Sequence, residues 1–170
     1  MKKEKHIDKD FAKRNIVWIG LIFAAIARLF LFPVRVTGVS MSPTYEDGKM
    51  LTTSIFTNSK NLKRGDVIVF HEGSTDEVMI KRIIGMPGDE IVISNNGIEI
   101  NGQLYEDSFT NDMKCPELGI LYWKLDAGEY FVLGDNRNDS LDSRRYGKIQ
   151  LAQIFAKVNT YNSKFTYSLN

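Results

Sequence analysis

The chain has 170 residues, enough for one ordinary domain with a short appendage but not for two full catalytic domains. Its 22 Lys and Arg against 21 Asp and Glu give a formal net charge of +1, so the composition does not favour a nucleic-acid-binding module. One cysteine, Cys115, and two histidines, His6 and His71, do not favour a disulfide framework or a structural zinc site. We therefore expect no metal or other cofactor.

The N-terminal part of the chain differs in charge and hydropathy from the rest. Residues 1–14 contain six Lys or Arg and three Asp or Glu, whereas residues 35–170 carry a net charge of −3. Between them, Ile16 to Phe32 is a run of seventeen residues with a single charge, Arg28. A helix of this length measures about 26 Å, close to the roughly 30 Å hydrocarbon core of a bilayer.

The flanking charges predict how such a helix would be oriented. Arg28 lies near the distal end, where a long side chain can reach the interface, and Pro33 is a natural helix terminator. Because basic residues flank only the first end, we expect residues 1–14 to be cytoplasmic, 15–34 to be a single-pass anchor in the cell membrane, and 35–170 to be extracytoplasmic. A cleaved secretory signal peptide is the alternative, but the apolar run exceeds the usual 7–15 residues and no small-residue cleavage site follows it.

After Pro33 the sequence changes to short runs rich in β-branched residues, separated by Gly, Asn, Asp and Pro. The clearest signal is a hairpin in which residues 91–94 and 98–100 flank Asn95-Asn96-Gly97. No long amphipathic helix, internal repeat or linker is evident in this part. The expected fold class is therefore mostly β, preceded by one transmembrane helix. The predicted strands are 35–39, 50–56, 66–71, 78–86, 90–94, 97–101, 130–133 and 153–161.

Several catalytic classes lack support in the sequence. A Ser-His-Asp triad needs a histidine in the β domain, and the only one is His71, at the end of a predicted strand, where a lone histidine is usually just exposed. The motifs H-E-x-x-H, Walker A and G-x-G-x-x-G are all missing from the chain, so zinc proteolysis and nucleotide chemistry have no motif. The remaining candidate is a serine with a lysine.

Ser40 lies within residues 36–44, where a predicted strand gives way to a Ser/Pro turn. A serine in such a turn commonly only hydrogen-bonds to the local backbone. Lys81 lies in an apolar strand, where alternation places it on the same face as Met79 and Ile83. A charged residue there can also serve to prevent unwanted pairing at an exposed edge strand, or its side chain can extend to solvent.

Burial would also give such a lysine a chemical role. It penalises the ammonium form, so the amine loses its proton more readily and can take one from a hydroxyl. At an ordinary pKa near 10.4, only about 0.04% of lysines are neutral at pH 7, too few for an efficient base. The apolar neighbours of Lys81 are the surroundings that a lowered pKa requires, so Ser40 and Lys81 form a candidate catalytic pair.

Four blocks of the sequence resemble, in order and spacing, the bacterial type I signal peptidases, specifically the short, single-anchor kind typical of Gram-positive bacteria. Together with the predicted anchor they span most of the chain. The blocks are Gly38-Val39-Ser40-Met41-Ser42-Pro43-Thr44, Arg64-Gly65-Asp66-Val67-Ile68-Val69-Phe70, Lys81-Arg82-Ile83-Ile84-Gly85-Met86-Pro87-Gly88-Asp89 and Gly134-Asp135-Asn136-Arg137-Asn138-Asp139-Ser140-Leu141-Asp142-Ser143-Arg144.

The resemblance implies that Ser40 is the nucleophile and Lys81 the general base of a Ser/Lys dyad. Such a serine endopeptidase removes signal peptides from exported preproteins through an acyl-enzyme. The Ser40 backbone N–H would help to bind the oxyanion. Some relatives have a second donor, a hydroxyl two residues before the nucleophile, but that position is Gly38 here and the second donor stays open. Ser140 would orient the Lys81 amine.

The resemblance also assigns supporting residues. Asp142 and Arg144 would form an ion pair that braces the site, and Asp135 and Arg82 would be structural in the same sense. Without the other blocks, this polar stretch would be interpreted as a solvated loop. Met41 is part of the apolar surface beside the site in the family, although simple core filling is an equal alternative.

The expected partners are preproteins with A-x-A-like cleavage sites and the lipid bilayer, and no nucleic acid. Two other classes remain open. One is a catalytically silent, membrane-tethered assembly or chaperone factor, which Ser40→Ala would leave functional. The other is a Ser/Lys autoprotease of the repressor type, although such proteins carry a DNA-binding domain where this chain has its predicted anchor.

Overall fold

The computed structural model describes residues 15–23, 31–55, 60–73, 75, 77–110 and 119–159. Residues 15–23 form a helix, and no helix within these described ranges is long and apolar enough to cross a bilayer. The predicted basic arm 1–14, residues 24–30 of the predicted anchor and Cys115 lie outside the described residues. The remainder is a mostly β domain, as the sequence predicts.

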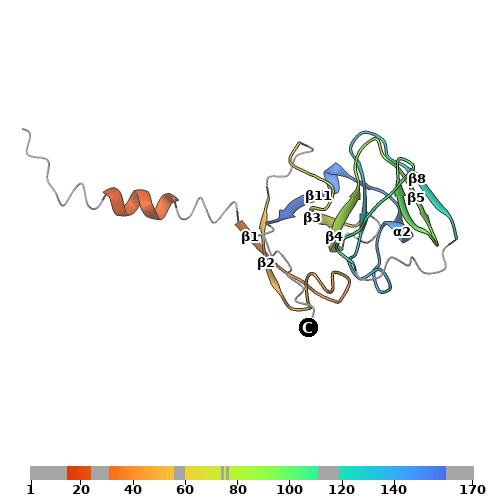
Figure 1. Ribbon diagram of the computed structural model, residues 1–170. Coiled ribbons are helices and arrows are strands. Elements are labelled where there is room, and N and C mark those ends of the chain that lie inside the picture. Colours follow the sequence, from red (N-terminus) through yellow and green to blue (C-terminus); the bar gives the residue numbers. More distant parts are fainter. Residues whose placement is uncertain are drawn as a thin grey trace, which may run out of the picture.

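The domain contains eleven strands in the described part of the chain, one short α-helix and one 3-10 turn (Figure 1). The α-helix is α2 (Ser143–Tyr146) and the 3-10 turn is η1 (Leu151–Gln153). The strands are β1 (Leu31–Arg35), β2 (Met50–Ser54), β3 (Val67–His71), β4 (Val78–Gly85), β5 (Glu90–Ser94), β6 (Gly97–Ile100), β7 (Gln103–Leu104), β8 (Leu121–Lys124), β9 (Glu129–Leu133), β10 (Ile149–Gln150) and β11 (Ile154–Val158).

Seven strands form a large antiparallel sheet in the order β1-β2-β11-β3-β4-β9-β10. The first strand differs from the prediction, which placed the helix through Phe32 and a strand at 35–39. Instead, Leu31–Arg35 pairs with β2. Pro33 is tolerated because β1 is the edge strand of the sheet, where a missing N–H disrupts no second ladder. Gly38, with φ of +87°, then turns the chain out of the strand.

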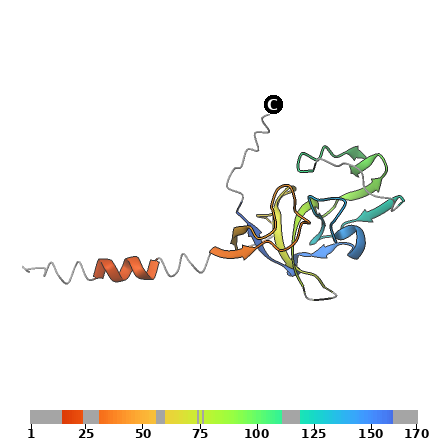
Figure 2. The same cartoon turned by 90° about the horizontal axis from the view of Figure 1, so that it is seen from below.

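A second sheet of four strands has the order β7-β6-β5-β8. The predicted hairpin is confirmed: Ile91 pairs with Ile100 and Ile93 with Ile98, and all four side chains are buried. Figures 1 and 2 place this sheet at the end of the domain opposite β1 and β2. The short strands β7, β8 and β10 were not predicted from the sequence.

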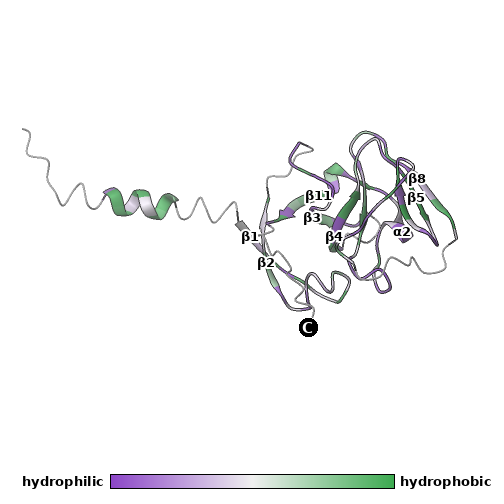
Figure 3. Ribbon diagram, in the orientation of Figure 1, coloured by the Kyte–Doolittle hydropathy of each residue, from purple (hydrophilic) through white to green (hydrophobic). Residues whose placement is uncertain are grey.

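Alternation along the central strands produces a core on each face of the large sheet. Val67 and Val69 of β3 join Ile80 in one buried cluster, whereas Ile68 and Phe70 join a second cluster with Ile83. A third cluster connects the end of β4 to the small sheet. The hydropathy colouring agrees, with hydrophobic residues concentrated on strands such as β4 and β5 (Figure 3). Strand β4 lies in the middle of this packing and is therefore a rigid platform for a functional side chain.

Candidate functional site

The turn after β1 presents Ser40. The Gly38 N–H donates to Asp47 Oδ1 at 2.8 Å, and the Ser42 N–H donates to the Val39 carbonyl at 3.0 Å. Met41 is fully buried in the core and lines the pocket beside Ser40, so it is both core filling and part of the apolar surface at the site. The turn is thus fixed on both sides of Ser40.

Lys81 projects from β4 toward this turn. Its Nζ lies 2.8 Å from Ser40 Oγ and 3.1 Å from the Ile80 carbonyl oxygen, and the residue is only 5% exposed. Burial lowers the pKa of the Lys81 ammonium, while the carboxylates of Asp142 and Asp135 act in the opposite direction. A buried amine in hydrogen-bonding contact with a hydroxyl can accept its proton once the amine is neutral.

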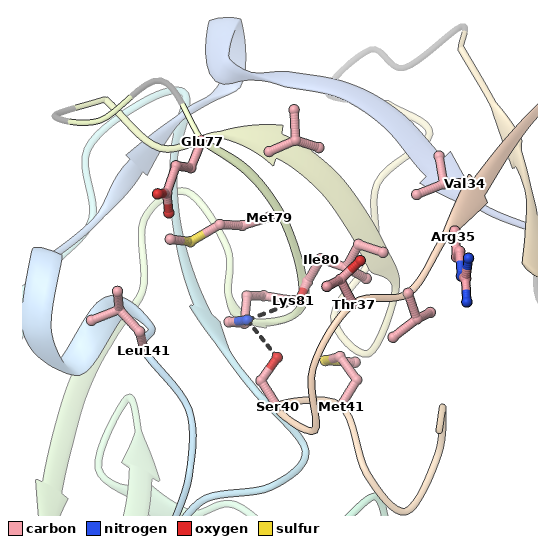
Figure 4. Close-up of a pocket in the computed structure, with 12 residues that line it drawn as sticks. Val34, Arg35, Thr37, Ser40, Met41, Glu77, Met79, Ile80, Lys81 and Leu141 are labelled. Atoms are coloured by element: carbon pink, nitrogen blue, oxygen red, sulfur yellow. Dashed lines mark hydrogen bonds between the residues drawn. The ribbon is translucent and has the colours of Figure 1, made fainter. Parts of the chain in front are cut away.

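Both residues line a pocket of about 390 Å³ (Figure 4). Residues 34–37 around β1 form part of its lining, residues 77–81 form another part, and Leu141 also contributes. The pairing of β4 with β9 begins only at Arg82, so residues 78–81 have a partner on the β3 side alone. The pocket therefore runs along an open strand edge that a peptide can join by β-augmentation.

The loop that follows β9 brings the first supporting ion pair to the site. Arg82 Nε and Nη2 donate to the two carboxylate oxygens of Asp135 at 2.7 and 2.6 Å, with both side chains almost fully buried. Arg82 Nη1 also donates to the Gly65 carbonyl at 2.7 Å. Because Arg82 is adjacent to Lys81 on β4, this bidentate contact fixes the loop against the strand that carries the lysine.

A second ion pair lies at the start of α2. Arg144 Nε donates to Asp142 Oδ1 and its Nη2 to Oδ2, both at 2.8 Å. Asp142 is also the N-cap of α2 and accepts the Gly134 N–H at 3.1 Å. The two ends of the loop are therefore tied together through one buried carboxylate.

Ser140 lies in the same loop but does not contact the amine in this structure. Its Oγ is buried and has no hydrogen-bond partner in the described part of the chain. It lies so close to Gly134 that a Cβ added there would be 2.1 Å from the Ser140 Oγ and 2.5 Å from the Ser40 carbonyl oxygen. The structure thus brings Ser140 beside the Ser40 turn without a bond to Lys81.

Further contacts to this loop come from residues that the sequence reasoning did not single out. The Asn136 N–H donates to the Ser40 carbonyl at 3.0 Å and its Nδ2 to the Val39 carbonyl at 3.3 Å. Arg137 Nε donates to the Gly134 carbonyl, and the guanidinium forms a short ion pair with Asp107, both side chains being 2% exposed. Asn136 and Arg137 are inside the fourth sequence block.

Asp107 belongs to the segment between β7 and β8 and is in none of the blocks. Phe109 of the same segment lies over the Arg82 guanidinium, 3.7 Å from the ring centroid. This segment therefore contacts both arginines of the loop region, Arg82 and Arg137, and no local pattern in the sequence indicates it. His71 stacks on Phe155 at 4.8 Å between ring centroids and is not among the residues that line the pocket.

Comparison with known proteins gives the affiliation of the chain. Residues 9–162 match the family described as signal peptidase, peptidase S26. The chain belongs to this signal peptidase family. It is 33% identical over 152 residues to signal peptidase I U of Bacillus subtilis (strain 168), which covers 85% of this chain and 81% of the relative. It is 32% identical over 184 residues to signal peptidase IB of Staphylococcus aureus (strain MRSA252), which covers 93% and 96%.

Among solved structures, a crystal structure of a signal peptidase I from Enterococcus faecalis V583 matches with a TM-score of 0.48 and 25% identity, covering 59% of this chain and 96% of that one. Membership of the signal peptidase family makes the chain a serine peptidase, and hence a hydrolase, and supports removal of signal peptides as its activity. The resemblance stated from the four sequence blocks is confirmed.

Proposed function

We propose that this protein is a membrane-anchored signal peptidase that cleaves exported preproteins with Ser40 as nucleophile and Lys81 as general base. The observation that carries the proposal is the 2.8 Å separation of Ser40 Oγ and Lys81 Nζ in a buried setting. An unbound serine hydroxyl is a weak nucleophile, and an amine of lowered pKa in contact with it is one of the few arrangements that activates it.

The steps follow from this contact. Neutral Lys81 takes the Ser40 hydroxyl proton as Oγ attacks the scissile carbonyl, and the resulting ammonium gives that proton to the leaving amine as the C–N bond breaks. The signal peptide is then held as an ester on Ser40. Lys81, neutral again, takes a proton from water as the water oxygen attacks the ester carbonyl, and returns that proton to Oγ as the acid product leaves.

The oxyanion of each tetrahedral intermediate needs a donor. The Ser40 N–H donates to no atom of the described residues and is available, whereas the Gly38 N–H is already donated to Asp47. A single donor of this kind is worth about 3–4 kcal/mol in transition-state stabilisation in other hydrolases. Gly38 provides no side-chain hydroxyl, so within the described turn the Ser40 N–H is the donor that we assign.

The preprotein segment would lie along the open edge of β4. Because the Glu77 carbonyl accepts a hydrogen bond from the β3 side, alternation directs the backbone groups of Val78 and Ile80 toward the open edge. An extended peptide that pairs with them places alternate side chains against the pocket walls. Apolar walls such as Val36 and Met41 suit the small side chains at the first and third positions before the cut that the family resemblance implies.

The anchor is supported by the sequence run from Ile16 to Phe32 and by the helix at residues 15–23. Every large apolar side chain of that helix is exposed, including Phe23 at 73%. An apolar helix with exposed side chains favours another apolar environment, and a bilayer provides one. This arrangement would hold the pocket on the extracytoplasmic side, at the membrane surface.

The direct test is cleavage of a preprotein by the full chain in detergent or lipid. We expect cutting after an A-x-A-like site, and expect Ser40→Ala and Lys81→Ala to abolish it while the circular dichroism spectrum stays unchanged. Unimpaired cutting by the Lys81→Ala protein would overturn the mechanism. A catalytically silent assembly factor would instead keep its cellular function after Ser40→Ala, which separates the two functions.

A further inference from the structure

We propose that Glu77 is a specificity-determining residue that selects a basic side chain four positions before the cleaved bond. The proposal rests on the proposed function, because it assumes that a peptide is cut at Ser40. Glu77 lines the same pocket as Ser40 and Lys81, from its far rim. Figure 4 shows its carboxylate directed from that rim toward the side of the pocket where Met79 and Leu141 lie.

The Glu77 carboxylate is free to bind a ligand. Within the described part of the chain it has no ion pair or side-chain hydrogen bond, and the residue is exposed. Its backbone is fixed by contrast, since the Glu72 N–H donates to the Glu77 carbonyl at 2.8 Å. The carboxylate is therefore an unpartnered charge held at a defined place beside the peptide path.

The register along β4 indicates which substrate position it faces. Glu77, Met79 and Lys81 lie on one face of the extended chain, because side chains alternate with period two. A peptide paired with this edge advances one residue per strand residue. Ile80 is on the other face, where it packs with Val36 and Met41. A peptide whose −1 and −3 side chains enter that apolar wall has them opposite Ile80 and Val78, and its position −4 then lies opposite Glu77.

A bound peptide can extend along β4 only from Lys81 toward Glu77. Beyond Lys81 the edge of β4 is closed, because Arg82 pairs with Leu133 of β9. A peptide can follow the strand edge from Lys81 toward Glu77 but not past Arg82. A carboxylate at that end attracts Lys or Arg and repels Asp or Glu on the substrate. The rest of the pocket wall near Glu77 is apolar, with Val78 and Met79 as neighbours.

The test uses two peptides with the same A-x-A-like site that carry Lys or Glu at position −4, cut by the full-length protein in detergent micelles at low salt. Because exposed ion pairs are individually weak, we expect kcat/KM to favour the Lys peptide by about five- to tenfold. The Glu77→Lys variant should invert this preference, and Glu77→Gln should reduce it to about one. Added salt should weaken it in the wild type.

The matched control is Glu99→Lys, which changes the same residue type on the small sheet and should leave the wild-type ratio unchanged. Peptides that carry the Lys or Glu at positions +2 to +4 instead should be cut by the wild type at equal rates. Equal cutting of the two −4 peptides by the wild type, or a ratio that Glu77→Lys does not alter, overturns the proposal. Neither outcome contradicts the proposed function. If the wild type cuts no such peptide, the proposed function and the role of Glu77 are both wrong.

Discussion

Lys81 Nζ lies 2.8 Å from Ser40 Oγ, although the two residues are 41 positions apart in the chain and belong to a central strand and a surface turn. The amine is held on the rigid side of this contact, since β4 pairs with β3 from Val78 to Arg82. The turn that carries the hydroxyl is held by the Asn136 N–H, which donates to the Ser40 carbonyl, and by the buried side chain of Met41. The functional pair therefore depends on the packing of three separate segments.

The first prediction concerns pH. The Lys81 pKa is lowered by burial, and the base must be neutral to act, so kcat/KM should rise with pH and level off at a midpoint below about 10.4. The measurement is a pH profile of peptide cleavage by the full chain in detergent. A rate that still increases about tenfold per pH unit up to about pH 9.5 would mean that the base has an ordinary lysine pKa, and the assignment of Lys81 would be wrong.

The second prediction is that the catalytic lysine reduces stability. Burial disfavours its charged form, so the unfolded chain binds more protons between the lowered pKa of Lys81 and about 10.4. We expect Lys81→Met to raise the free energy of unfolding by about 1–2 kcal/mol at pH 7. The difference should shrink as the pH rises through that window, because the wild-type amine becomes neutral in both states.

The check is urea unfolding of both proteins at pH 7 and at pH 10. Lys63→Met is the matched control, since Lys63 is exposed and its replacement should change the stability by less than about 0.5 kcal/mol. If Lys81→Met were less stable than the wild type at pH 7, the amine would be well solvated or well paired, contrary to the cause that we assign to its pKa.

The third prediction concerns Gly134. A Cβ there would meet the Ser140 Oγ at 2.1 Å and the Ser40 carbonyl oxygen at 2.5 Å, both far inside van der Waals contact. Gly134→Ala should therefore displace the Ser40 turn, lower kcat by more than about tenfold and destabilise the domain by about 1–3 kcal/mol. Gly20→Ala, where the added Cβ meets nothing within 4 Å, is the control that should retain activity. Wild-type kcat in Gly134→Ala would show that the turn tolerates movement.

The sequence predicted those parts of the fold that depend on interactions between residues close together in the chain. The hairpin of β5 and β6 was predicted because β-branched residues flank an Asn-Gly turn, and the two strands pair directly across that turn. Strand β1 was misplaced because its position depends on pairing with β2 rather than on its own composition. The two-residue strands β7 and β10 are too short for any periodic signal.

In the candidate site too, some residues have a local sequence signal and others depend on how distant segments pack. The sequence indicated Ser40 and Lys81 because a turn serine and an apolar strand lysine each stand out locally. It could not indicate Asp107, which forms a buried ion pair with Arg137, 30 positions away. Such a pair depends on how two loops meet, and no spacing rule along one chain segment describes it.

The fourth prediction follows from that ion pair. Asp107→Ala leaves the guanidinium of Arg137 buried without its carboxylate, so we expect a loss of about 3–5 kcal/mol in the free energy of unfolding. The exposed pair of Lys124 and Glu90 offers the comparison, because Glu90→Ala should change stability by less than about 1 kcal/mol. Urea unfolding measures both. Equal small effects would mean that solvent reaches the Arg137 pair.

The fifth prediction distinguishes the buried hydroxyl of Ser140 from that of Ser143. Ser143 Oγ accepts the Val132 N–H at 3.0 Å, so Ser143→Ala leaves a buried donor unsatisfied and should cost about 1–3 kcal/mol of stability. Ser140 Oγ has no partner within the described residues, so Ser140→Ala should change stability by less than about 0.5 kcal/mol.

Activity should respond to Ser140 for a different reason. The hydroxyl lies beside the Ser40 turn, and we expect it to hydrogen-bond to the Lys81 ammonium once Ser40 has reacted with substrate. Ser140→Ala should then lower kcat by about tenfold or more with KM little changed, and Ser140→Thr, which keeps the hydroxyl, should recover part of the rate. A Ser140→Ala enzyme with wild-type kcat would show that the hydroxyl has no part in the reaction and that its buried position serves packing alone.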